Sequence, residues 1–160
     1  MSDRLNVKVG AWPWQPSPGA NLVKTYHLHQ VPLIGLLHEP DTNTTHLFAR
    51  RYTAEETLSV WMYVTVTQGD VNALDLSVKE SRDHFRKVLT DLEAKRHVFY
   101  ALAHSEQGVL SEFESRGPAP AARRLDHALE EAVQKDGSLR DDADEILELF
   151  ARRQQATPTP

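Results

Sequence analysis

The sequence has no cysteine and no closely spaced glycines. Its seven glycines are scattered so that no two form G-x-G, whereas the dinucleotide-binding fingerprint and the phosphate-binding loop need clustered glycines for backbone to approach phosphate. The G-x-S-x-G and H-E-x-x-H patterns of serine hydrolases and zinc proteases are absent as well. The sequence therefore carries none of these catalytic signatures, and disulfide bonds are excluded.

The sequence also lacks a long hydrophobic run. No stretch approaches the roughly 20 apolar residues that a membrane-spanning helix needs. The first ten residues alternate polar and apolar side chains, which is not the pattern of a secretory signal. Because the absence of cysteine suits a reducing compartment, we predict a cytoplasmic protein with no membrane partner.

An excess of positive charge is missing too. The net charge is -5, and the arginine doublets at 50–51, 123–124 and 152–153 do not amount to a stripe. Nucleic-acid affinity usually depends on a basic field that neutralises phosphates. We therefore do not expect a nucleic-acid partner.

What is present is the composition of an ordinary globular protein, with 40% hydrophobic and 26% charged residues. The clearest strand covers residues 58–67, where Val60 and Met62 point one way while Trp61 and Tyr63 point the other. Apolar groups on both faces indicate a central strand that is covered on both sides. Further strands are expected over residues 5–9, 22–30, 33–38 and 45–52, with residues 39–44 as a hairpin connection.

The second half of the sequence is dominated by helical patterns. Ser77 and Glu80 have the spacing of a capping box, which predicts a helix over residues 77–95. Residues 97–113 leave two interpretations open, because they could continue this helix or form a hairpin that turns at Gly108. We favour the hairpin, since valine, phenylalanine and tyrosine stand together at 98–100 and such residues are enriched in strands.

A Gly-Pro-Ala-Pro linker at 117–120 leads into two amphipathic helices, over 121–135 and 138–154. Their short connection suits an antiparallel helical hairpin. We predict a core domain over 1–116, a C-terminal helical hairpin appendage over 117–154 and a disordered tail over 155–160. The predicted fold is α+β, with an antiparallel sheet of about five or six strands covered by the 77–95 helix.

Histidines are concentrated on the N-terminal strands. Two of them are separated by one residue on a strand, so their rings share a face and can chelate a divalent metal. A hairpin centred on Thr42 would set two others opposite each other, with Glu39 and Asp41 as further ligands. The alternative is that these are ordinary core or edge histidines. The four candidate metal ligands are His27, His29, His38 and His46.

A second candidate is the pair Trp12 and Trp14, which prolines at 13, 16 and 18 hold in a loop. Rigid aromatic side chains are frequent at the centre of protein interfaces. Three other uses remain open: the tryptophans could cover an open face of the sheet, bind a small ligand or carbohydrate, or form part of a polyproline ligand. The last lacks the flanking basic residue.

The C-terminal helical hairpin is the third candidate. Leu147 and Phe150 lie on the apolar side of its second helix. This side could dock on the sheet, or it could dimerise or grip another protein.

The sequence thus favours a non-catalytic, cytosolic protein-interaction or regulatory module without a cofactor. Its partner would be another protein, or a second copy bound through the C-terminal helices. The alternative is a metal-binding protein or metal-dependent enzyme that uses a divalent metal on the histidine cluster to lower the pKa of a bound water.

Overall fold

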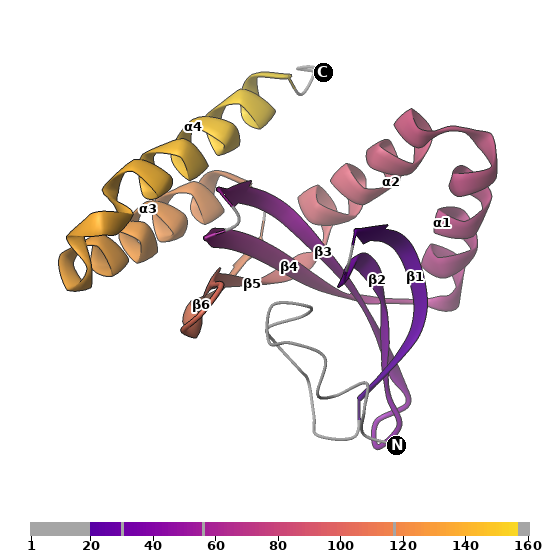
Figure 1. Cartoon of the computed structure of the whole chain (residues 1–160). Coiled ribbons are helices and arrows are strands. Elements are labelled where there is room, and N and C mark those ends of the chain that lie inside the picture. The colour runs from indigo at the N-terminus through magenta and orange to yellow at the C-terminus, as the bar shows by residue number, and fades with distance from the viewer. Residues whose placement is uncertain (1–19, 30, 56, 117, 157–160) are drawn as a thin grey trace.

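The structure, a computed structural model, describes residues 20–29, 31–55, 57–116 and 118–156. Within these ranges, six strands form one sheet in which each strand is antiparallel to the next along the chain (Figure 1). The strands are β1 (Asn21–His29), β2 (Val31–Glu39), β3 (Thr44–Ala54), β4 (Leu58–Val66), β5 (His97–His104) and β6 (Gly108–Arg116).

Helices α1 (Gln68–Glu80) and α2 (Arg82–Lys95) connect β4 to β5. Helix α3 (Pro118–Lys135), a short 3-10 turn (Gly137–Leu139) and helix α4 (Arg140–Ala156) follow β6. Figure 1 shows both helix pairs on the same side of the sheet, α1 and α2 toward β1 and α3 and α4 toward β6. The predicted α+β fold with a C-terminal helix pair is confirmed. None of the described helices is long and apolar enough to cross a membrane.

Strand β4 lies in the middle of the sheet and has buried apolar residues on both faces. On the first face, Val60 and Met62 belong to a large core shared with residues of the helices, such as Leu89 and Ile146. On the second face, Trp61 belongs to a smaller cluster that is made of strand residues alone among those described. The alternation of side chains predicted for a central strand is therefore confirmed.

The hairpin interpretation of residues 97–113 is confirmed, since β5 and β6 pair from His97 opposite Arg116 to His104 opposite Gly108. Gly108 has a φ of 83°, a left-handed conformation that glycine adopts without steric cost. The side chains at 98–100 alternate between the two faces, which places Val98 and Tyr100 in the first-face core and Phe99 beside the second-face cluster.

The helix predicted to begin at Ser77 begins nine residues earlier, so that prediction was wrong. Thr67 caps α1 by accepting a hydrogen bond from the Asp70 backbone N–H, while the Asp70 carboxylate accepts one from the Thr67 N–H. Ser77 is a buried interior residue whose hydroxyl donates to the Leu74 carbonyl. The helix ends at Glu80 because Ser81 is extended and caps α2.

Asp70 also joins the start of α1 to the start of β5. Both of its carboxylate oxygens accept hydrogen bonds from the Arg96 guanidinium, at 2.7 and 2.8 Å. Burial works to raise the pKa of Asp70, but hydrogen bonds from Arg96 and the Thr67 backbone outweigh it and hold this pKa below its usual value. The ionised carboxylate therefore stabilises the fold, and protonation removes that contribution.

We predict that Asp70→Asn lowers stability most at neutral pH. A group whose pKa is depressed by folding contributes stability above its unfolded pKa and loses it as the pH falls toward the folded pKa. The difference in free energy of unfolding between wild type and Asp70→Asn should therefore shrink as the pH falls below about 4. Urea unfolding at a series of pH values measures this, and a difference independent of pH would contradict it.

Candidate functional site

The predicted pairing of His38 with His46 is not observed. A hairpin centred on Thr42 was expected to pair His38 with His46, but the strands pair His38 with Thr45 and Leu37 with His46. This shift of one residue turns the two histidines to opposite faces of the sheet, because side chains alternate along a strand. The turn that sets this register has Asn43 in a left-handed conformation, with a φ of 53°.

Each of these histidines has ordinary polar neighbours. His38 lies 3.3 Å from the Thr45 hydroxyl on the first face. His46 is buried on the second face, with its Nε2 3.4 Å from Glu39 Oε1 and its Nδ1 3.2 Å from the Thr65 hydroxyl.

The remaining members of the predicted metal site do not restore it. His27 is an exposed residue of β1, and its Cα partner on β2 is Ile34. His29 lies at the end of β1, but its side chain is outside the described part of the molecule. Among the residues described, no group of three or more histidine, aspartate or glutamate side chains could hold a metal ion.

The residues predicted to contact a partner protein differ in where they lie in the structure. Trp12 and Trp14 lie outside the described residues. Phe150 is only 6% exposed, and its ring centroid lies 5.5 Å from that of Tyr52 in β3, so it packs in the core between α4 and the sheet. Leu147 is partly buried against the same core. Helices α3 and α4 both contribute residues to the core on the first face of the sheet.

A buried charged cluster ties α2 to the first face of the sheet. Glu93 of α2 accepts hydrogen bonds at Oε1 from Arg51 Nη2, at 2.9 Å, and Nε, at 3.2 Å. Its Oε2 accepts from the Tyr100 hydroxyl at 2.7 Å. Burial, and then the Glu93 carboxylate, raise the pKa of Tyr100, so the phenol stays protonated and donates. The Tyr100 ring stacks on Phe113, which makes this cluster part of the packing.

An open polar groove lies between β6 and α3. One hollow of about 480 Å³ lies between the middle of β6 and the first half of α3. A second, of about 280 Å³, follows toward the β5–β6 turn, and Ser111, Ala128 and Glu131 line both. The apolar residues that line this groove are Leu110, Phe113, Ala128, Ala132 and Leu139.

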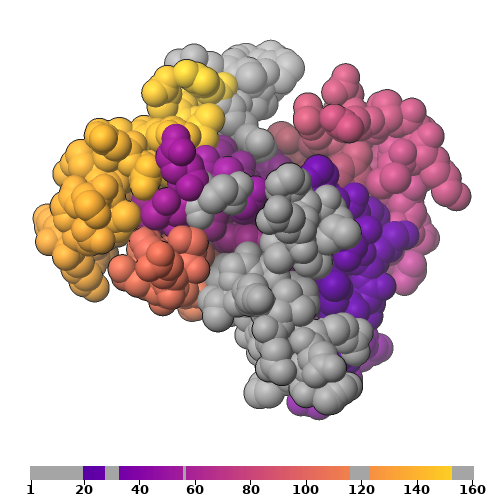
Figure 2. Space-filling model, viewed as in Figure 1, coloured from indigo at the N-terminus to yellow at the C-terminus, as the bar shows by residue number. Residues whose placement is uncertain are grey.

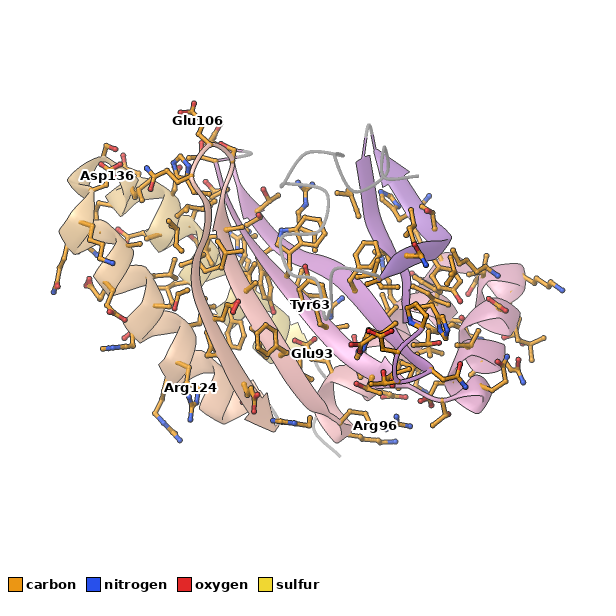
Figure 3. The ribbon with its side chains drawn as sticks, turned by 90° about the horizontal axis from the view of Figure 1, so that it is seen from below. Tyr63, Glu93, Arg96, Glu106, Arg124 and Asp136 are labelled. Atoms are coloured by element: carbon orange, nitrogen blue, oxygen red, sulfur yellow. The ribbon has the colours of Figure 1, made fainter. Side chains whose placement is uncertain are left out.

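Helix α3 runs alongside β6 in the opposite direction. In Figure 3, Asp136 at the end of α3 lies at the same end of the molecule as Glu106 in the β5–β6 turn, and Arg124 lies at the other end. Figure 2 shows the salmon-coloured β5–β6 hairpin beside the orange surface of the C-terminal helices. The groove therefore runs beside residues 110–113 of β6.

The two edges of the sheet differ in regularity. Among the described strands, β6 pairs with β5 on one side and with no strand on the other. Its register is uninterrupted from Ser111 to Arg116. At the opposite edge, β1 has three register shifts against β2, and such bulges discourage further pairing. β6 is thus the edge with the more regular backbone.

The α3 wall of the groove carries two arginines, a histidine and a glutamate in the first hollow, and Lys135 in the second. His127 and Glu131 lie one helical turn apart, with Nε2 and Oε1 3.2 Å from each other. Arg123 and Arg124 are exposed, and neither has an acidic partner among the described residues. On the strand side, Glu112 is the exposed acidic residue that lines the groove.

Sequence patterns did not identify this site. The doublet Arg123-Arg124 is visible in the sequence, but without the fold nothing places it beside an edge strand. The amphipathic pattern of α3 did identify the buried stripe, and Leu125, Leu129 and Val133 are buried as that pattern requires. The polar residues that flank this stripe become a groove wall only through the β6 contact.

Comparison of the chain with models of protein families, with curated proteins and with solved structures found no match.

Proposed function

We propose that the protein is a non-catalytic, cytoplasmic protein-interaction module that binds an extended segment of a partner protein along β6. The observation that carries this proposal is the groove between a regular edge strand and α3. It refines the interaction module that the sequence favours, and it moves the predicted contact from Leu147 and Phe150 on α4 to α3.

The backbone of β6 supplies the first part of the interaction. An edge strand presents unpaired N–H and C=O groups, to which an extended peptide can add as a further strand. The uninterrupted register of residues 111–116 keeps these groups evenly aligned. Main-chain hydrogen bonds of this kind give affinity with little dependence on peptide sequence.

The groove supplies the second part of the interaction, which is contact with the side chains of the bound segment. Successive side chains of an added strand point to opposite faces of the sheet, so every second one would enter the space between β6 and α3. Phe113 and Ala128 offer apolar contacts there, and Leu110, Ala132 and Leu139 do so nearer the turn. Pockets for alternate side chains are how strand addition gains sequence preference.

The test is selection of peptides from a random display library against the full chain, followed by affinity measurements with proline variants of β6. Neighbouring residues of a strand point their N–H groups to opposite edges. One of Ser111→Pro and Glu112→Pro should therefore remove an outward N–H and spare the pairing with β5. We expect this variant to keep its melting temperature and to bind about tenfold more weakly or worse.

Ser111→Ala and Glu112→Ala are the matched controls, because they change the same side chains but keep the N–H groups. Both should retain the affinity. The proposal is wrong if no peptide is selected, or if the proline variant with unchanged stability binds like the wild type. If the chain associates with itself along β6, a second copy is the occupant, and sedimentation of the proline variants would show the loss of a dimer.

A further inference from the structure

The groove contains a site for an acidic side chain at Arg123 and Arg124, beside the middle of β6. Four other arginines of the described chain are engaged by carboxylates within the molecule. These ion pairs are Arg51–Glu93, Arg96–Asp70, Arg140–Glu130 and Arg152–Glu148. Against this background, Arg123 and Arg124, which have no acidic partner in the described part of the chain, are available to a ligand at one end of the groove.

The lack of an acidic partner does not by itself distinguish Arg123 and Arg124 from the other arginines of the described chain. Arg82 and Arg86 on α2 are also exposed and without an acidic partner among the described residues, but they do not line this groove. Arg123 and Arg124 are distinguished by their position, because both line the hollow that faces residues 111–113 of β6. A strand added to β6 would carry its side chains past them.

The other charges of the groove leave the arginines in excess at this end. Glu131 lies against His127, which leaves Glu112 as the carboxylate of the first hollow without a basic partner among the described residues. The first hollow is therefore lined by two arginines and by one carboxylate that has no basic partner in the described part of the chain. The arginine fork matches a carboxylate with two parallel hydrogen bonds, and arginine is more weakly hydrated than lysine.

We propose that the segment bound along β6 carries an aspartate or glutamate whose carboxylate is held by Arg123 or Arg124. This inference rests on the proposed function, since it specifies the peptide that the groove accepts. The apolar residues Phe113 and Ala128 lie in the same hollow. The preferred peptide therefore combines an acidic residue with an apolar residue on the same face of its strand.

The test repeats the peptide selection with the wild-type chain and with the charge reversal Arg123→Glu/Arg124→Glu. We expect wild-type selections to be enriched in aspartate and glutamate, and selections on the reversal variant to favour lysine and arginine. Peptides selected on the wild type should bind the reversal variant at least about tenfold more weakly. Their affinity for the wild type should also fall as salt is added, because exposed charges are screened.

Arg152→Glu is the control for a general effect of charge, because Arg152 is exposed on α4 and does not line the groove. It should leave the affinity and the residue preference unchanged. Peptides that depend on β6 but show no acidic preference would overturn this inference and leave the proposed function standing. If no peptide is selected, both fail. An equal loss in Arg152→Glu would mean that overall charge, and not this site, attracts the peptide.

Discussion

Replacing Glu93 by alanine is expected to lower the free energy of unfolding by about 3–5 kcal/mol. The substitution leaves the Arg51 guanidinium, whose side chain is 6% exposed, without its carboxylate. It also removes the acceptor of the Tyr100 hydroxyl. A buried charge that loses its partner retains its desolvation penalty without compensation, which is why the loss is large. Urea unfolding followed by circular dichroism measures it.

Two further variants separate the buried charge from other effects. In Arg51→Met/Glu93→Leu both charges are replaced by apolar side chains, and most of the lost stability should return, because buried ion pairs are often replaceable by well-packed apolar groups. Glu148→Ala breaks the exposed pair with Arg152 and should cost no more than about 1 kcal/mol. If Glu93→Ala costs as little as Glu148→Ala, the cluster is open to water and does not tie α2 to the sheet.

Phe150→Ala is expected to cost about 3–5 kcal/mol, because it leaves a cavity between α4 and the sheet. The Phe150 side chain is 6% exposed and packs on Tyr52. This loss is a large part of the free energy of unfolding of an ordinary domain. The melting temperature of Phe150→Ala should therefore fall markedly. Thermal unfolding by calorimetry is the measurement.

Arg152→Ala is the matched control on the same helix, and its stability should change by less than about 0.5 kcal/mol. Sedimentation of Phe150→Ala distinguishes the two uses of the helical hairpin that the sequence leaves open. If the hairpin docks on the sheet, Phe150→Ala should lower the free energy of unfolding and leave the oligomeric state of the folded protein unchanged. Unchanged stability with a loss of self-association would instead make Phe150 an interface residue.

The strands could be predicted because their patterns are local. Trp61 and Tyr63 alternate with Val60 and Met62, and this alternation alone indicates a strand buried on both faces. The β5–β6 hairpin was recognised from its cluster of strand-forming residues and from Gly108, whose positive φ fits that position. Such signals lie within a few residues of each other.

The start of α1 was missed because two local signals competed. Gly69, which lies in the first turn of α1, is a residue that disfavours a helix in the sequence, whereas Ser77 and Glu80 have the spacing of a capping box. The chain uses Thr67 and Asp70 instead. What decides between them is tertiary, since Asp70 also receives the Arg96 guanidinium from the start of β5.

The metal hypothesis was sensitive to a single residue of register. Thr42 as the centre of the turn would place His38 and His46 together, whereas the observed pairing of His38 with Thr45 separates them by the thickness of the sheet. Turn geometry sets register, and the left-handed Asn43 could not be inferred from residue spacing. The groove could not be predicted from the sequence for a related reason. Its two walls come from β6 and α3, and no local pattern indicates that these two elements pack together.

Hydrogen exchange of the β6 amides, measured with and without a selected peptide, tests the central claim most directly. Strand addition along β6 predicts that alternate amides between Ser111 and Arg116, those that face away from β5, become protected when the peptide binds. The amides that already pair with β5 should change little. Protection confined to β1, or to the exposed faces of α1 and α4, would show that the peptide binds elsewhere and would contradict the account.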